Sequence, residues 1–215
     1  CMENLVTVTI RSTHYHLIES AQGWWMVDTG WAGTLPALQG QLRRSGISLE
    51  QIRFLMFTHH HPDHAGLTQE LKQASGARLV IHEVQLPYLK DLAEFYRGKQ
   101  DAFLPVQVGA DDIVVNDENR GRLQSLGLQG EILTTPGHSS DSVSLVLDSG
   151  MAFTGDLPPP GVTLEENSSM TIASWRKLLQ HSVHTVYPAH SRPFSSDVIR
   201  SLLQQVENGD AEDSP

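Results

Sequence analysis

Short apolar runs recur along the chain and predict β-strands. Apolar and polar residues alternate over residues 5–10 and 14–18, which is the period of a strand with one buried face. Further along, apolar runs are bounded by turn-forming residues, as in the strands of a layered domain. These runs lie at residues 24–27, 52–57, 77–81, 113–115, 131–134, 142–147, 152–156 and 185–190.

Segments with helical spacing separate several of these strands. Helices are predicted over residues 34–45, 65–75 and 174–179. In the second of them, Leu67 and Leu71 lie one turn apart before Gly76, which is a typical stop residue. Because strands and helices alternate, the pattern predicts a layered α/β domain, not a helical bundle or an all-β sandwich.

A longer and less regular segment follows residue 82. Its spacing is helical from 83 to 99 but is interrupted by Pro87. The segment 85–103 carries four aromatic residues, Tyr88, Phe95, Tyr96 and Phe103. Such a segment is often a mobile lid or the wall of a binding site, although aromatic residues at helical spacing are more often simple packing.

Length and composition fit one globular domain. The chain has 215 residues, of which 39% are hydrophobic, enough to bury a sizeable core. We expect a single domain over residues 1–200, followed by a helix end and an acidic, disordered tail over 201–215. The sequence shows no apolar run long enough for a membrane span and no signal peptide, so a cytoplasmic location is expected.

Charge and cysteine content exclude several classes of protein. The formal net charge is −10 and Lys and Arg are not clustered, which disfavours a nucleic-acid partner, because binding phosphates requires clustered positive charge. Cys1 is the single cysteine, so neither an internal disulfide nor a cysteine-based zinc site can form. Any metal ion therefore has to be held by histidine and aspartate side chains.

A cluster of such side chains lies in the segment 58–64, Thr-His-His-His-Pro-Asp-His, directly after the predicted strand at 52–57. Imidazole nitrogen and carboxylate oxygen suit zinc and its first-row neighbours. If alternate side chains turn to opposite sides, His59 and His61 face one ion, whereas Asp63 and His64 face a second. The alternative is a solvated polar loop that is rich in histidine by chance.

Further ligand-type residues follow other predicted strands. His138, Asp156 and His190 each stand where an apolar strand ends, and Asp28 stands at the end of the strand at 24–27. Each of these residues alone is ordinary turn chemistry. His138, Asp156 and His190, together with the four ligand-type residues of the histidine loop, supply seven ligands on one edge of the domain. Asp28 either caps a turn or accepts a hydrogen bond that orients a ligand histidine.

The other histidines lack this setting. His14 and His16 share one face of a predicted strand, and we interpret them as half-exposed strand residues, with metal ligation as the weaker alternative. His60, His181 and His184 are interpreted as solvent-facing or packing residues.

The histidine loop, His138, Asp156, His190 and the upstream Asp28 together resemble the metallo-β-lactamase superfamily, over positions 5 to 195. The resemblance implies a four-layer αββα sandwich with a metal site along one edge. It also implies a first metal held by His59, His61 and His138, and a second held by Asp63, His64 and His190. Asp156 would bridge the two ions, and Asp28 would support the loop from behind.

This ligand set implies a hydrolase with two divalent ions, zinc by preference, with iron or manganese as alternatives. The paired ions would share a water and present hydroxide to the carbonyl of a small-molecule ester, thioester or lactone. Asp63 would orient that hydroxide or relay a proton. The alternatives are a phosphodiesterase or nuclease of the same superfamily and a non-catalytic metal-binding module.

Within the superfamily, the ligand set is similar to the glyoxalase II, lactonase and small esterase branches. No cysteine occupies a metal position, and the turn at 20–23 is too short for a long substrate-gripping hairpin, so penicillin hydrolysis is disfavoured. The C-terminal helical domain with which glyoxalase II binds glutathione is not expected here. We expect the segment 85–103 and the proline loop 157–161 to form opposite walls of the substrate site.

Overall fold

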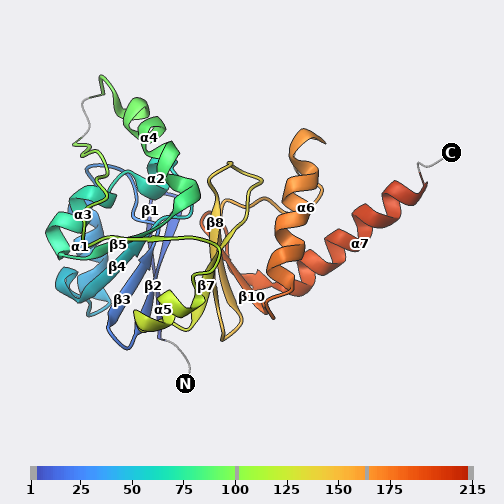
Figure 1. Ribbon diagram of the computed structural model, residues 1–215, viewed down its shortest axis with the longest axis horizontal. Helices are drawn as coiled ribbons and strands as arrows, with labels where there is room; N and C mark the ends of the chain where they lie inside the picture. Colours follow the sequence, from blue (N-terminus) through green and yellow to red (C-terminus); the bar gives the residue numbers. More distant parts are fainter. Residues whose placement is uncertain (1–3, 100–101, 163–164, 213–215) are drawn as a thin grey trace.

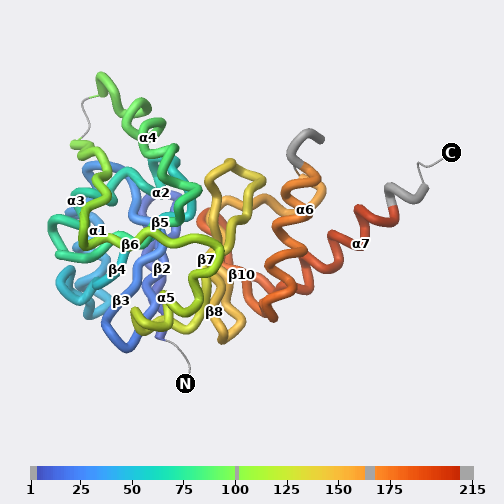
Figure 2. Tube along the Cα trace, viewed as in Figure 1, coloured from blue at the N-terminus to red at the C-terminus, as the bar shows by residue number. Residues whose placement is uncertain are grey.

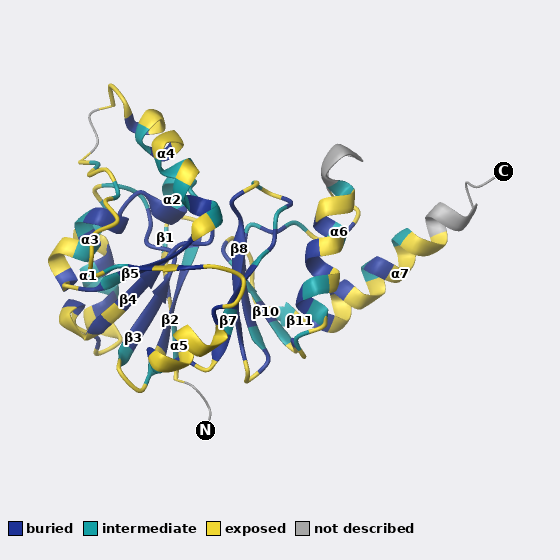
Figure 3. Ribbon diagram, in the orientation of Figure 1, coloured by how far each residue is buried: buried dark blue, intermediate teal, exposed yellow. Residues whose placement is uncertain are grey.

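Two β-sheets lie face to face with helices on their outer sides (Figure 1). The structure is a computed structural model, and it describes residues 4–99, 102–162 and 165–212. In Figure 3 the buried residues follow the strands, whereas exposed residues gather on the outer helices. The four-layer αββα sandwich implied by the sequence is therefore confirmed.

The first sheet has six strands in the order of the sequence. They are β1 (Leu5–Ile10), β2 (Thr13–Ser20), β3 (Gly23–Val27), β4 (Ile52–Met56), β5 (Arg78–His82) and β6 (Ile113–Val115). The first three strands pair antiparallel, and β3 to β6 pair parallel. Parallel neighbours require crossover connections, and helices supply them here.

The helical elements attached to this half cover the outer face of the first sheet or its ends. They are α1 (Leu35–Arg44), η1 (Leu49–Gln51), α2 (Pro62–Ala65), α3 (Thr68–Ser75), η2 (Glu83–Tyr88) and α4 (Leu89–Tyr96). The short helix α5 (Arg120–Ser125) packs against the second sheet instead. The helix predicted over 65–75 is divided into α2 and α3. The division arises because the amide of Leu67 donates to the carbonyl of Gly30 at 2.7 Å, which takes it out of the helical hydrogen-bond pattern.

The second sheet has five strands in the order β11-β10-β9-β8-β7. They are β7 (Gly130–Thr134), β8 (Val143–Leu147), β9 (Met151–Gly155), β10 (Thr185–Pro188) and β11 (Phe194–Ser195). Only the pair β9 and β10 is parallel. The connection between these two strands contains α6 (Glu165–Leu179), which begins earlier than the helix predicted at 174–179.

Three apolar clusters account for the four layers. The first packs α1 and α3 against the first sheet, through residues such as Leu38 and Leu71. The second lies between the sheets and includes Trp25 and Phe153, and the third packs α6 and α7 (Ser196–Glu212) against the second sheet, with Trp175 at its centre. Burying apolar surface in three such interfaces is the dominant stabilising contribution to the fold.

The chain from 201 to 212 is helical, where we expected a helix end followed by an acidic, disordered tail. Ile199 and Leu203 of α7 are buried in the third cluster, and α6 and α7 lie side by side (Figure 2). Once a helix is anchored in this way, each further residue extends it at little cost. Glu207, on the same helix, forms an ion pair with Arg176 of α6. Residues 213–215 lie outside the described part of the chain.

No helix in the described residues is long and apolar enough to cross a lipid bilayer.

His16 is buried between the two sheets, not half-exposed as its strand pattern indicated. Its ring contacts Phe153 and Tyr187, and only 4% of the residue is exposed. The β1–β2 pairing places Thr7 opposite, where its hydroxyl lies 3.0 Å from Nδ1. Burial lowers the pKa of His16 to about 4, so this histidine is neutral at pH 7.

We expect this burial to make folding pH-dependent. Between pH 6.5 and 4 the unfolded chain binds a proton at His16 that the folded chain does not, so stability is present above pH 6.5 and is lost on acidification. The loss at this one site amounts to about 3 kcal/mol. Urea unfolding of the metal-free protein at pH 7 and pH 4 should show a smaller drop for His16→Gln than for the wild type. Equal drops would contradict the assignment.

Candidate metal centre

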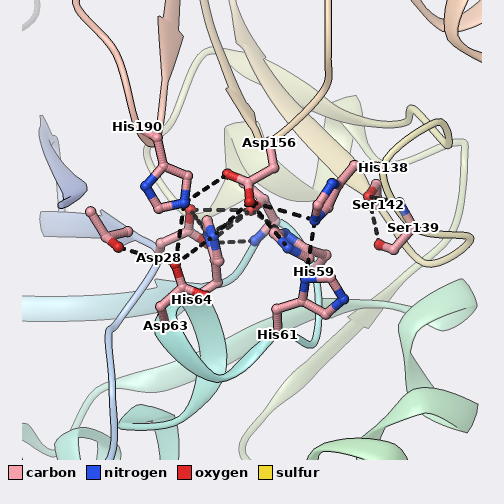
Figure 4. A network of polar contacts seen from close by, with 12 residues as sticks. Asp28, His59, His61, Asp63, His64, His138, Ser139, Ser142, Asp156 and His190 are labelled. Atoms are coloured by element: carbon pink, nitrogen blue, oxygen red, sulfur yellow. Dashed lines mark hydrogen bonds and ion pairs between the residues drawn. The ribbon is translucent and has the colours of Figure 1, made fainter. Parts of the chain in front are cut away.

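Seven histidine and aspartate side chains converge at one edge of the sandwich (Figure 4). The loop after β4 carries four of them, and the others follow β7, β9 and β10. Because these strand ends lie at the same edge, residues up to 131 positions apart in the sequence come together. The seven are His59, His61, Asp63, His64, His138, Asp156 and His190.

Two separate groups of three side chains have their ligand atoms within 4.8 Å of one another, and a third combination that joins them, His59, His64 and Asp156, meets the same limit. In the first group, His59, His61 and His138, the His61 Nδ1 and the His138 Nε2 are 3.0 Å apart. In the second group, Asp63 Oδ2 lies 3.3 Å from the His64 Nε2 and 3.2 Å from the His190 Nε2.

The carboxylate of Asp156 lies between the two groups. Its Oδ2 is 3.5 Å from the His138 Nε2 and 3.3 Å from the His64 Nε2. Its Oδ1 is 3.3 Å from the His190 Nε2. One carboxylate thus faces nitrogen atoms from both groups.

Asp28 lies behind the histidine loop and holds it. Its carboxylate accepts hydrogen bonds from the backbone amide and the hydroxyl of Thr58, at 2.7 and 3.0 Å, and lies 2.9 Å from the His64 Nδ1. This contact turns the opposite nitrogen of His64 toward Asp63 and Asp156. Asp28 has a φ of 63°, a conformation that costs free energy in a non-glycine residue and that these hydrogen bonds stabilise.

The turn between β1 and β2 supports the second group, and the sequence analysis did not identify it. The hydroxyl of Thr13 donates to Asp63 Oδ2 at 3.1 Å, and the His190 Nδ1 lies 2.8 Å from the carbonyl of Ser12. Tyr15 donates from its hydroxyl to the backbone carbonyl of Asp63 at 3.3 Å. A hairpin turn has no sequence signal for such distant contacts.

Electrostatics keeps most of the imidazoles neutral. Burial, followed by the charges of neighbouring histidines, lowers the pKa of His59 and His61, and burial lowers the pKa of His138. Burial also acts to lower the pKa of His64, but the neighbouring carboxylates of Asp28, Asp156 and Asp63 raise it well above the usual value. Neutral imidazole is the form that binds metal ions.

The two carboxylates of the centre stay ionised. Burial raises the pKa of Asp63 and of Asp156, but the charge of the neighbouring His64 outweighs burial, and both pKa values lie below the usual range. Ionised oxygen atoms are good ligands for divalent cations.

Three buried atoms of the centre have no hydrogen-bond partner: the Nε2 atoms of His59 and His64, and Oδ1 of Asp156. Ion-pair distances connect them to neighbours, but without hydrogen-bond geometry. Leaving a buried polar atom unpaired costs about 1–3 kcal/mol. The donor set therefore fits bound divalent cations, which would give all three atoms a partner.

A cavity of about 320 Å³ opens beside the centre. His138, Asp156 and His190 line one side of it. The remaining lining residues are Thr154, Gly155, Leu157, Pro158, Pro159, Pro188, Ser191 and Phe194. The proline loop thus forms a wall of this cavity, as expected.

None of the described residues of the segment 85–103 lines this cavity. Within the part of that segment that the structure describes, Tyr96 is buried and stacks on Phe103, whereas Phe95 is exposed. Tyr88 is nearest to the centre, stacked on His60 with ring centroids 5.2 Å apart. Two of the four aromatic residues therefore pack against the first sheet, and the expected second wall is not observed here.

Comparison with known sequences identifies the family. The model of the metallo-β-lactamase superfamily matches residues 8–190. A probable metallo-hydrolase of Methanocaldococcus jannaschii is 24% identical over 180 residues, covering 77% of this chain and 81% of the relative. A hydroxyacylglutathione hydrolase of a Bradyrhizobium species is 32% identical over 112 residues, covering 52% of this chain and only 34% of the relative.

Comparison with solved structures confirms the fold. A subclass B3 metallo-β-lactamase of Bradyrhizobium japonicum superimposes with a TM-score of 0.71 at 19% identity, covering 98% of this chain and 91% of that chain. At this identity the likeness concerns the arrangement of the chain and not the substrate. The match over residues 8–190 shows that this chain belongs to the metallo-β-lactamase superfamily and is a metallo-hydrolase of that superfamily.

Proposed function

We propose that this protein is a binuclear metal-dependent hydrolase that cleaves the ester, thioester or lactone bond of a small molecule. The observation that carries the proposal is the position of Asp156, whose two carboxylate oxygens face histidines of both ligand groups at 3.3 to 3.5 Å. A single carboxylate in this position is suited to bridging two cations.

In this proposal His59, His61 and His138 hold one ion, and Asp63, His64 and His190 hold the other. Asp156 contributes to both. When bound, the ion pair would supply a water of lowered pKa and a Lewis acid for the carbonyl oxygen. Zinc suits this all-nitrogen-and-oxygen donor set best, and iron or manganese would also be accepted by it.

Asp63 has a second role in the proposal. Its carboxylate is ionised, is held by the hydroxyl of Thr13 and is partly exposed, so it can accept a hydrogen bond from a water molecule. A carboxylate in that position orients the attacking oxygen and can carry a proton toward the leaving group. Asp28 acts only through Thr58 and His64, which it keeps in place.

The cavity favours a small substrate without large negative charge. Among the described residues, its lining includes no lysine or arginine, and most of the lining residues outside the ligand set are apolar. A nucleic-acid or polyphosphate substrate would need clustered positive charge, and the chain carries a formal net charge of −10. The same features therefore argue against the alternative of a phosphodiesterase or nuclease.

Hydrolysis of a substrate panel tests this function. Short-chain thioesters, lactones, simple phosphodiesters and β-lactams should be compared with the same zinc-loaded protein, before and after treatment with a chelator. We expect chelator-sensitive turnover of the thioesters or lactones. Turnover of the phosphodiesters alone would favour a phosphodiesterase or nuclease. If the metal-loaded protein turned over none of these substrates, the proposed hydrolase activity would be contradicted.

We also expect the protein to bind two metal ions per chain, because two groups of three ligands share one bridging carboxylate. Elemental analysis of protein purified without chelator should then give about two equivalents, and His190→Ala should reduce this to about one. His14→Ala, which removes a histidine outside the centre, is the matched control and should leave the content unchanged. A single equivalent in metal-replete wild type would contradict the expectation.

A further inference from the structure

Asp141 is a buried carboxylate next to the metal centre that the proposed chemistry does not use. It is completely buried. Its Oδ2 accepts the backbone N–H of His60 at 2.9 Å, and its Oδ1 lies 2.8 Å from the Nδ1 of the same histidine. The hydroxyl of Ser139 donates to Oδ1, also at 2.8 Å. One carboxylate thus has three partners from two segments of the chain.

These two segments are the loops that carry the first ligand group. His60 lies between His59 and His61, and Ser139 follows His138 directly. The hydroxyls of Ser139 and Ser142 are 2.8 Å apart, which closes the second loop on itself. Asp141 therefore connects the loop of two proposed ligands to the loop of the third.

His60 is also held on the side of its ring. Tyr88 of η2 stacks on the imidazole with an interplanar angle of 30°. The side chain of His60 is only 17% exposed. With a carboxylate at Nδ1 and an aromatic ring on its face, His60 is fixed, and the backbone on either side of it is fixed with it.

The free-energy cost of burying Asp141 suggests that this residue has a role in orienting its neighbours. Burying a carboxyl group is expensive unless hydrogen bonds satisfy its oxygen atoms. Here the compensation comes from His60 and Ser139, and no lysine or arginine among the described residues forms an ion pair with Asp141. An apolar side chain such as leucine at position 141 would cost less free energy to bury. It would not form the hydrogen bonds that orient the neighbouring imidazoles.

We propose that Asp141 is a positioning residue for the first metal position, acting through His60 and Ser139 to fix His59, His61 and His138 relative to one another. The proposal rests on the proposed metal centre. Groups that orient metal ligands typically contribute about 10- to 100-fold to metal affinity. The inference therefore predicts that loss of Asp141 weakens one of the two metal positions and spares the other.

Site-resolved metal titration tests the proposal. Zinc affinity is measured by competition with a chromophoric chelator in two backgrounds: His190→Ala, which leaves the first group intact, and His61→Ala, which leaves the second group intact. Asp141→Asn should weaken zinc binding about 10- to 100-fold in the first background and leave it unchanged in the second. Equal weakening in both backgrounds, or none in either, would overturn the proposal.

Two further variants separate positioning from folding. Asp112→Asn is the matched control, because Asp112 is also a buried carboxylate that accepts backbone amides, of Leu79 and Gly109, away from the centre. It should leave both affinities unchanged. His60→Ala removes the Nδ1 contact and the stacking on Tyr88 but keeps the backbone N–H contact to Asp141, and it should cause a smaller loss than Asp141→Asn, in the first background alone. If Asp141→Asn does not fold, His60→Ala decides the question by the same criterion.

The outcomes for this inference and for the proposed function are distinct. A wild-type protein that binds no zinc would refute the proposed metal centre itself. A wild-type protein that binds two equivalents, with Asp141→Asn binding both as tightly, would refute only the positioning role of Asp141.

Discussion

Replacing Asp156 by alanine is expected to lower kcat/KM far more than replacing Asp28. Asp156 faces histidines of both ligand groups, so its loss removes a ligand from each proposed ion and leaves the two ions to repel each other without a shared anion. The carboxylate of Asp28 contacts Thr58 and the Nδ1 side of His64, so it acts on the centre through these two residues. Its loss should cost about 10- to 100-fold, the range typical of groups that orient a ligand.

Steady-state kinetics with a thioester or lactone from the panel measure this difference, with each variant compared at measured metal content. Asp156→Asn is a useful companion, because it keeps the volume and one oxygen but removes the charge. Its activity should lie between those of Asp156→Ala and the wild type. A bridging role for Asp156 is untenable if Asp156→Ala, loaded with two ions, turns over substrate as fast as the wild type.

Most strands were predictable because their signal is local. Alternation over β1 and β2 and the apolar runs of β4, β8 and β9 are visible in five or six residues, and turn residues bound them. The two-residue β11 and the six-residue α5 are too short to give a periodic pattern, and α5 buries only Leu123. For α7 the sequence predicted only a helix end, because the acidic residues at its C-terminal end offer no apolar face, whereas the helix runs from Ser196 to Glu212.

The residues of the centre were predictable because each follows a strand and is of a ligand type. Their supporting residues were not. Asp141 looks like part of an ordinary turn, and its partner His60 is 81 positions away. Thr13 and Ser12 lie in a hairpin turn with no feature that connects them to Asp63 or His190. Such contacts depend on how the two sheets pack, which no local pattern encodes.

Burial of single side chains was also hard to predict from pattern. His16 lies in a strand whose pattern indicated partial exposure, and Tyr96 lies in a segment for which a lid or binding-site wall was one interpretation, yet both are buried. His16 is covered by Phe153 and Tyr187 from the second sheet, and Tyr96 by Phe103. In each case the covering residue comes from another segment of the chain. The spacing of apolar residues within the strand or helix therefore does not predict how far these two side chains are exposed.

The second large effect is expected for Gly155→Ala, which should destabilise the fold by about 2–5 kcal/mol. Gly155 has a φ of 56°, and an added Cβ would lie 2.4 Å from the Thr58 hydroxyl and 2.7 Å from its Cβ. Thr58 cannot move freely, because its hydroxyl and amide are bonded to Asp28. The clash would therefore be transmitted to Asp28 and His64, so zinc affinity should fall along with stability.

Gly76→Ala separates the two causes of this effect. Gly76 ends α3 with a φ of 71°, but nothing lies within 4 Å of the position of its Cβ, so this variant carries only the conformational cost of about 1–2 kcal/mol. Chemical unfolding of both metal-free variants gives the difference in the free energy of unfolding that is due to the contact with Thr58.

If Gly155→Ala is no less stable than Gly76→Ala and binds zinc as the wild type does, then the close approach of β9 to the histidine loop does not constrain the centre. A larger loss at Gly155, accompanied by weaker zinc binding, would mean that the glycine before Asp156 is required because the two ligand-bearing strand ends meet there without room for a side chain.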